Sequence, residues 1–321
     1  MRRRDLMVIL GAAVTWPLAE AWTQDVGRRY RLGVLVQSPR NAAHWVAFFD
    51  ELRKSGFVEG DNLSVVDGFK APLDRAEMIA KTIVNARPDA IMTAGVFTRV
   101  IQRETQAIPI VTVSDDLLAE HAVASLAHPG ANTTGISIFA TELDGKRQEI
   151  LLEAVPRARR IAILADRGVT APRQLERLTN AARARGISVS VHQASGAEDI
   201  LPAMDAALAA GAEALNVLAS ALLNLHRAEI IMHAAKIRLA AIYQWPEAAE
   251  EGGLIAYGPR FVTLYRRHAL QAVKVLKGTK PGDIPVEQPT QFELVINVKT
   301  TKSLSLTIPP SLLARADKVI E

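Results

Sequence analysis

The chain has 321 residues, of which 49% are hydrophobic and 22% are charged, and its formal net charge is +4. It contains no cysteine, which excludes disulfide bonds, thiolate nucleophiles and cysteine metal sites. Basic pairs such as Arg159-Arg160 and Arg266-Arg267 are scattered along the chain beside acidic residues, so we expect solvated helix faces and no nucleic-acid interface.

The first 21 residues have the three parts of an export signal. Residues 1–7 carry three arginines, an apolar run follows through Leu18, and Ala19-Glu20-Ala21 is a small-x-small cleavage site. The run is shorter than the ~20 helical residues that span a bilayer, so it predicts targeting and not anchoring. Residues 3–7 are similar to a twin-arginine signal, and an ordinary Sec signal is the alternative. With no cysteine for a lipid anchor, we expect a free periplasmic protein cleaved after about Ala21.

Short apolar runs then alternate with amphipathic segments. The first half is predicted to contain strands at 30–36, 63–66, 90–94 and 108–113 and helices at 44–55, 74–85 and 97–105. Regular alternation of strand and helix indicates parallel βαβ units with right-handed crossovers. We therefore expect an open, doubly wound parallel sheet.

The same pattern starts again in the second half. It predicts helices at 142–154, 172–185, 198–210 and 224–236 and strands at 160–164, 187–191, 214–218 and 239–243. A strand at 253–257, a helix at 261–276 and a strand at 292–298 follow. If the chain recrosses near Tyr257 and near residues 285–289, residues 28–138 and 258–287 form lobe 1. Residues 139–257 and 288–321 then form lobe 2, and the fold class is α/β with two parallel-sheet lobes joined by a multi-strand hinge.

Ligands of open parallel sheets bind beyond the carboxyl ends of the strands. In lobe 1 this rule selects Gln37, Ser38, Gly95, Val96, Phe97, Thr98, Ser114 and Asp115. In lobe 2 it selects Asp166, Ser220, Tyr243 and Trp245, with Tyr257 at a crossover.

The candidate residues suit a small ligand that carries an anionic and a cationic group. Gly95 lets the backbone N–H groups that follow it approach a carboxylate at the positive end of a helix, although a plain tight turn also explains this glycine. Asp115 could pair with an ammonium group, although Asp115 or Asp116 could instead cap the next helix. Phe97, Tyr243, Trp245 and Tyr257 could cover an apolar or aromatic ligand, whereas Trp45 lies within a helix and is expected in the core.

Motifs of known enzyme classes are absent from the sequence. There is no His-Glu-x-x-His zinc motif, no Gly-x-Ser-x-Gly elbow and no Gly-x-Gly-x-x-Gly after the first strand. We therefore expect no catalysis, no metal and no cofactor.

Several stretches together carry a family resemblance. They are 52–62 (LRKSGFVEGDN), 125–135 (SLAHPGANTTG), 145–147 (GKR), 241–243 (AIY), 252–254 (GGL), 257–259 (YGP), 289–297 (PTQFELVIN) and 308–313 (IPPSLL). With them the chain resembles the ABC-transporter substrate-binding proteins typified by the tryptophan-binding protein TrpX. It departs from them at residues 114–117, where Ser-Asp-Asp-Leu replaces a Gly-Asp-Pro pattern, and in lacking the lipobox cysteine.

The resemblance implies a periplasmic binding protein of type I, whose two lobes close on a small solute and deliver it to an ABC permease in the inner membrane. The expected ligand is a small carboxylate, either an amino acid or an aromatic or branched relative. A periplasmic sensor subunit that presents its bound metabolite to a membrane receptor is the alternative, since both roles use the same hinge.

Overall fold

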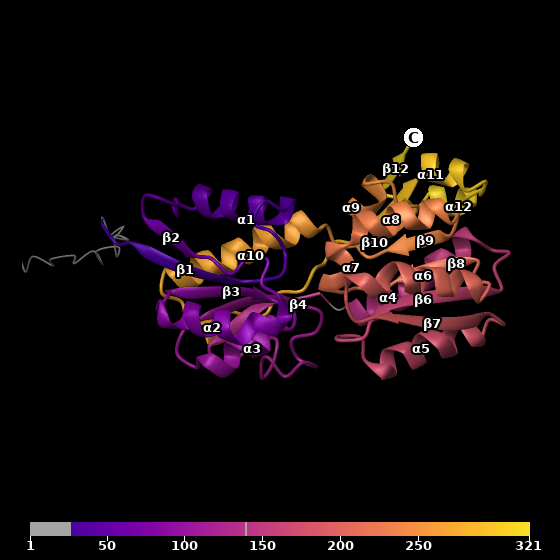
Figure 1. Cartoon of the computed structure of the whole chain (residues 1–321). Coiled ribbons are helices and arrows are strands. Elements are labelled where there is room, and N and C mark those ends of the chain that lie inside the picture. The colour runs from indigo at the N-terminus through magenta and orange to yellow at the C-terminus, as the bar shows by residue number, and fades with distance from the viewer. Residues whose placement is uncertain (1–26, 139) are drawn as a thin grey trace, which may run out of the picture.

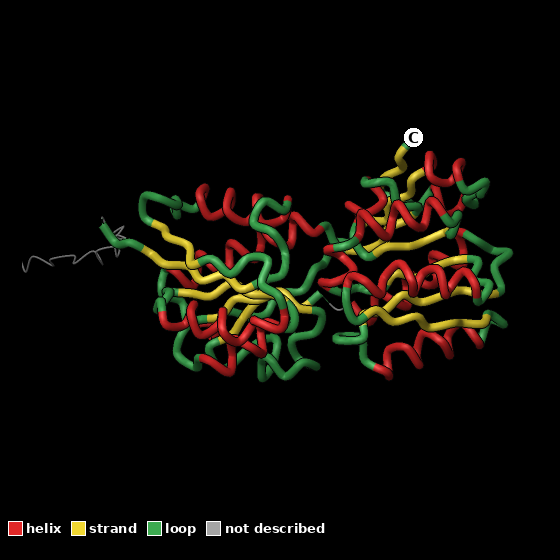
Figure 2. The backbone as a smooth tube through the Cα atoms, in the orientation of Figure 1, coloured by secondary structure: helices red, strands yellow, loops and turns green. Residues whose placement is uncertain are grey.

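The computed structural model describes residues 27–138 and 140–321, so the predicted export signal lies outside the described residues. Two α/β lobes lie side by side (Figure 1). One is built on a five-stranded sheet and the other on a seven-stranded sheet, and helices cover both faces of each (Figure 2). The predicted fold class of two α/β lobes with parallel sheets is confirmed. No helix in the described ranges has the length and hydropathy needed to cross a membrane.

Lobe 1 contains an all-parallel sheet with strand order β2-β1-β3-β4-β5. Its strands are β1 (Tyr30–Leu35), β2 (Leu63–Val66), β3 (Ala90–Ala94), β4 (Ile110–Ser114) and β5 (Thr133–Ser137). Its helices are α1 (Ala43–Lys54), η1 (Leu73–Arg75), α2 (Ala76–Asn85) and α3 (Phe97–Glu104). The apolar side chains of α2 and α3 pack on one face of the sheet, and those of α1 pack on the other.

Lobe 2 contains a sheet with strand order β12-β11-β10-β9-β8-β6-β7. Its strands are β6 (Arg160–Asp166), β7 (Ser188–Ala194), β8 (Ala214–Val217), β9 (Ala240–Tyr243), β10 (Ile255–Gly258), β11 (Glu293–Asn297) and β12 (Lys318–Ile320). Its helices are α4 (Ala140–Ala154), α5 (Pro172–Arg183), α6 (Ala197–Ala209), α7 (Ala221–Leu225), α8 (Arg227–Lys236), α9 (Pro246–Glu250), α11 (Val298–Ser303) and α12 (Pro310–Leu313).

The chain leaves lobe 2 after β10 and returns to lobe 1 as α10 (Phe261–Leu276), followed by the short η2 (Pro281–Asp283). In Figure 1, α10 crosses the left-hand lobe, although the strands before and after it in sequence, β10 and β11, belong to the right-hand one. Its apolar face packs on α1 and on the first sheet, and the side-chain amide of Gln271 donates to the Gly135 carbonyl at 3.1 Å. Glu287 then forms a bridge with Ile136 beside β5.

The path of the chain explains one departure from an all-parallel second sheet. Strand β10 ends at the side of lobe 2 that faces lobe 1, and the excursion through α10 brings the chain back at that same side. Strand β11 therefore runs in the opposite direction and pairs antiparallel with β10. The remaining pairs in this sheet are parallel.

Several elements differ from the sequence-based expectations. The helix expected at 224–236 is two helices, α7 and α8, which meet at His226. Strand β5, with the sequence TTGIS, carries too few apolar residues to give a strand pattern, although it is fully buried. The short elements α9, α11, α12 and β12 have between three and six residues each and give no readable period.

Candidate functional site

The residues that follow the parallel strands of both lobes lie where the two lobes face each other, and we call this region the crevice. The clearest evidence comes from Asp115, which follows β4 in lobe 1. The carboxylates of Asp144 and Asp166 and the guanidinium of Arg147, all in lobe 2, act electrostatically on Asp115. Residues that follow strands of different sheets therefore share one space.

On the lobe 1 side, Gly95 forms the turn between β3 and α3 and has a φ of +53°. A Cβ atom added to Gly95 would meet no atom within 4 Å, so the space beside this turn is open. Helix α3 starts at Phe97, and Val96 at its N-cap provides no side-chain capping bond. The Thr98 N–H donates to the Gly95 carbonyl at 3.0 Å, whereas the N–H groups of Val96 and Phe97 make no backbone hydrogen bond within the described ranges and are available to an anion. Thr98 is buried and pairs with the hydroxyl of Thr112 at 2.7 Å, which fixes the start of α3 on β4.

The segment after β4 separates the roles of two neighbouring aspartates. The carboxylate of Asp116 accepts the backbone N–H groups of Leu118 and Ala119 at 3.1 and 3.0 Å and so caps the turn. No hydrogen bond to the side chain of Asp115 occurs in residues 27–138 and 140–321. The buried Ser114 hydroxyl donates to the Glu120 carboxylate at 2.6 Å. Asp115 is therefore the carboxylate of this segment that remains available to a ligand.

The surroundings of Asp115 disfavour its charged form. Burial raises the pKa of Asp115 to about 7, and the Glu120 carboxylate is the next cause. The carboxylates of Asp144 and Asp166 raise it further, whereas Arg147 opposes the shift. A ligand cation in the crevice would replace the missing counter-charge.

On the lobe 2 side, Asp166 ends β6 and accepts the N–H of Gly168 at 2.8 Å. Burial raises the pKa of Asp166, and the hydrogen bond from the Gly168 N–H lowers it. The Ser220 hydroxyl oxygen accepts the N–H of Leu223 at 3.0 Å as the N-cap of α7. Ser220 thus fixes the start of α7 after β8.

Sequence reasoning missed a buried ion pair at the base of the crevice. Asp144 and Arg147, one turn apart on α4, are almost fully buried and bond to each other. Asp144 also accepts from the side chain of Gln174, and Arg147 donates to the carbonyl of Tyr257 at 3.2 Å. Burial raises the pKa of Asp144, whereas its bonds to Arg147 and Gln174 lower it. The sequence Gly145-Lys146-Arg147 resembles an exposed helix face, so its charge gave no signal of burial.

Trp245 connects the two lobes through a row of rings. Its ring lies 4.5 Å from that of Phe261, which in turn lies 4.6 Å from the ring of His44 on α1. Trp245 is 6% exposed and packs into the lobe 1 core, although it follows a strand of lobe 2. Within the described ranges its Nε1 is buried and has no hydrogen-bond partner. This N–H could donate to a ligand.

The structure places two predicted rings in the cores and not on the crevice wall. Phe97 is 2% exposed and packs with Leu35 and Ile101 between the first sheet and its helices. Tyr243 is also 2% exposed and packs in the lobe 2 core, where burial raises its pKa. These side chains differ from the expectation because a position at a strand end or helix start does not fix the direction of the side chain.

The other predicted residues are Ser38, Gln37 and Tyr257, and their role in binding stays a prediction. The Ser38 hydroxyl accepts Trp45 Nε1 at 2.8 Å, so it orients the buried Trp45. Gln37 is partly buried and lies two residues after the end of β1. Tyr257 is partly buried, and its ring lies 6.2 Å from that of Phe292.

Two further features do not belong to this site. A cavity of about 930 Å³ lies on lobe 1 between α3 and residues 118–132, away from the strand ends. It opens widely to solvent, and polar side chains in it such as Gln102 and Asn132 are already hydrogen-bonded to the backbone. No group of three or more His, Asp or Glu side chains placed to hold a metal ion occurs in the part of the chain that the structure describes.

Comparisons with known proteins show the family and the fold. Residues 32–320 match the family model described as ABC transporter substrate binding protein. The chain is 24% identical over 288 residues to a protein named tyrosine-binding protein from Clostridioides difficile, covering 88% of this chain and 83% of the relative.

Solved structures show the same fold. A conserved domain protein from Vibrio cholerae O1 biovar eltor superposes with a TM-score of 0.81 at 24% identity, covering 91% of this chain and 99% of that one. A domain from Streptococcus pneumonia in complex with L-Trp gives 0.78 at 20% identity, covering 90% and 99%. The fold is that of periplasmic binding proteins of type I, and the chain belongs to the family of ABC transporter substrate-binding proteins.

Proposed function

We propose that the protein binds an α-amino acid, preferably an aromatic one, in the crevice between its lobes. The observation that carries this proposal is the position of Asp115. Its carboxylate has no hydrogen bond within the described ranges, and it faces carboxylates of the other lobe. A ligand ammonium between Asp115 and Asp166 would turn repulsion between the lobes into attraction.

The carboxylate of the ligand finds its complement a short distance along the same sheet edge. The first-turn N–H groups of α3 follow the open turn at Gly95, and a helix N-terminus favours an anion. A zwitterion with adjacent ammonium and carboxylate groups therefore suits lobe 1 at β3 and β4. The Trp245 indole, with a buried and unpartnered N–H, offers an aromatic surface beside it.

Two relatives support the choice of ligand. One is named a tyrosine-binding protein, and the other was solved in complex with L-Trp. These descriptions concern those proteins, and the proposal for this chain rests on the charges and rings described above.

We further propose that the two lobes, 28–138 with 258–287 and 139–257 with 288–321, move as bodies in the periplasm. Ligand contacts to both lobes stabilise the closed state and shift the population towards it. An ABC permease in the inner membrane then recognises the closed, loaded form. Turnover of the ligand has no place in this function.

The test is titration calorimetry of residues 22–321 with L-tyrosine and L-tryptophan. Tyramine, which lacks the carboxylate, and 3-(4-hydroxyphenyl)propionate, which lacks the ammonium, serve as matched probes. We expect L-tyrosine or L-tryptophan to bind and both probes to bind at least ~10-fold more weakly, because each leaves one charged complement unpaired.

Asp115→Asn should reduce the affinity for the amino acid by ~10-fold or more. It should also reduce the difference in affinity between the amino acid and 3-(4-hydroxyphenyl)propionate. Asp61→Asn is the matched control, because Asp61 is exposed and precedes β2 at the opposite edge of the same sheet. Equal affinities of the amino acid for both variants would contradict the role of Asp115.

A further inference from the structure

The chain crosses between the lobes three times: after β5, between β10 and α10, and before β11. The second crossover, from β10 to α10, is held by more contacts than the third. It has only Pro259 and Arg260 between the last residue of β10 and the first residue of α10. Gly258 before it leaves no room for a side chain, because an added Cβ would lie 2.0 Å from the carbonyl oxygen of Gln244. Proline then fixes φ and removes a donor.

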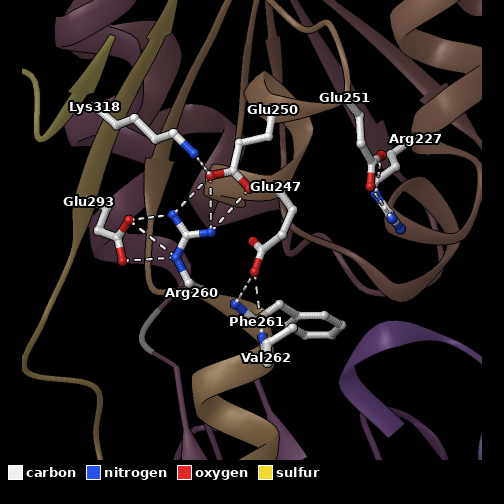
Figure 3. Close-up of polar contacts among 9 residues, drawn as sticks. All are labelled: Arg227, Glu247, Glu250, Glu251, Arg260, Phe261, Val262, Glu293 and Lys318. Carbon is white, nitrogen blue, oxygen red and sulfur yellow. Dashed lines mark hydrogen bonds and ion pairs between the residues drawn. The ribbon is translucent and has the colours of Figure 1, made fainter. Parts of the chain in front are cut away.

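Arg260 binds the carboxylates of two lobe 2 residues (Figure 3). Its Nε donates to Glu293 at 3.0 Å, and its Nη1 donates to Glu250 at 3.1 Å. Lys318 donates to the same Glu250 at 2.8 Å. Hydrogen bonds to Glu293 are the main cause that raises the pKa of Arg260. Because Glu293 is the first residue of β11, this cluster also ties the second crossover to the end of the third.

A carboxylate of lobe 2 caps the helix of lobe 1 at this point. Glu247 on α9 accepts the backbone N–H groups of Phe261 and Val262, with the closer contact at 3.0 Å (Figure 3). Phe261 and Val262 open α10, which provides no side-chain cap of its own. A carboxylate at the positive end of a 16-residue helix is favourable. Burial nevertheless raises the pKa of Glu247, so this contact holds a desolvated carboxylate.

The first turn of α10 also packs against both lobes. The Phe261 ring lies 4.5 Å from Trp245 of lobe 2 and 5.0 Å from Tyr265 in the lobe 1 core. By contrast, residues 288–292 of the third crossover have no regular secondary structure and are mostly exposed. Their backbone makes no hydrogen bond to any residue that the structure describes.

We propose that the junction of α9 and α10 is the pivot about which the lobes close, with Arg260 and Glu247 as its positioning residues. This rests on the proposed closure of the lobes. The junction keeps its contacts in the open and closed forms, and residues 288–292 take up the change in backbone direction. Loosening the junction broadens the range of lobe orientations and leaves the crevice side chains intact.

The experiment measures distances between spin labels in the protein without ligand. The chain has no cysteine, so Met78→Cys on α2 and Glu176→Cys on α5 give one labelled position in each lobe, both exposed. In this background we expect Arg260→Met to widen the distance distribution roughly twofold and Glu247→Gln to widen it less, because the amide keeps an acceptor for the helix N–H groups.

Two matched variants serve as controls. Glu251→Gln removes the partner of Arg227 beside α9, and this ion pair lies wholly within lobe 2. Thr290→Gly loosens the third crossover. Both should leave the width unchanged, and each variant is first shown to fold by a cooperative thermal melt. If Arg260→Met does not fold, Glu293→Gln replaces it.

Widths that stay at the wild-type value in Arg260→Met or Glu293→Gln and in Glu247→Gln would overturn the pivot. The pivot would also be overturned if Thr290→Gly widened the distance distribution as much as the junction variants do. Because no ligand is present, the result is independent of the amino-acid proposal: a protein that binds no amino acid could still show the pivot, and one that binds tyrosine could still lack it.

Discussion

At the scale of single residues, the carboxylate of Asp115 is free to bind a ligand, and its surroundings disfavour its charged form. It has no hydrogen bond within the described ranges, and burial raises its pKa to about 7. The unfolded chain gives an aspartate its ordinary pKa near 3.8. The folded protein therefore binds a proton at Asp115 across the interval between these values, where the unfolded chain does not.

This difference predicts a pH-dependent stability without ligand. A raised pKa contributes stability that is complete below about pH 4 and is lost as the pH rises through 7. Asp115→Asn removes this titration. The free energy of unfolding of the variant, relative to that of the wild type, should therefore rise by ~2 kcal/mol from pH 4 to pH 8. This value is reduced for the partial exposure of the side chain. Urea unfolding of both proteins at these pH values measures the change. A difference that does not vary with pH would contradict the assignment.

From the sequence, the ends of the strands could be placed, but not the directions of the side chains that follow them. The strand-end rule selected Ser114, Asp115 and Trp245, and their role in binding stays a prediction. It could not show that Tyr243 turns into the core, because successive side chains of a strand alternate between its faces. It also missed the Asp144–Arg147 pair, since charged residues at helical spacing usually face solvent.

At the scale of elements, the glycines of β5 and α4 occupy opposite environments. Gly135 lies in β5 with a φ of +156°, and an added Cβ would lie 1.9 Å from the carbonyl oxygen of Thr112 in β4. Gly145 lies within α4, where an added Cβ would meet nothing within 4 Å. The close approach of β5 to β4 allows Gln271 of α10 to reach the Gly135 carbonyl.

Two alanine substitutions should therefore act in opposite directions. Gly135→Ala should destabilise the protein by ~3 kcal/mol or more, because backbone atoms of β4 have to move. Gly145→Ala should stabilise it by ~0.5–1 kcal/mol, because alanine restricts the unfolded chain and suits a helix. Thermal melts of the two variants in parallel decide the matter. Destabilisation by Gly145→Ala would show that α4 does not tolerate a side chain there.

Long elements of lobe 1 were predicted to within about two residues, because their apolar period extends over several turns or a whole buried strand. The strand at 63–66 and the helix at 261–276 agree with β2 and α10 at both ends. The short elements α9 and β12 were missed, since their structure comes from tertiary contacts and not from local pattern.

At the scale of the whole molecule, the two lobes are interleaved along the chain. Helix α10 completes the core of lobe 1 after most of lobe 2 has been passed, and β11 and β12 then complete the second sheet. Strand β11 pairs with both β10 and β12, and Glu293 at its start binds Arg260. The last 30 residues are thus bound to the rest by a sheet and an ion pair.

Cutting the third crossover should leave the molecule in one piece. A protease site inserted after the exposed Thr290 gives two fragments on cleavage. We expect them to co-elute in gel filtration without denaturant and to separate in urea, because β11 is buried in the sheet of lobe 2. Separation without denaturant would show that backbone continuity, and not sheet pairing, holds this end in place.

The interleaving of the lobes along the chain also affects when each core can form during synthesis. Because α10 covers Trp45 and Phe48, we expect the apolar surface of lobe 1 to stay exposed until residue 276 has left the ribosome. We therefore expect the core of lobe 1 to close only after α10 has been made, and the second sheet to close only after β11 has followed it.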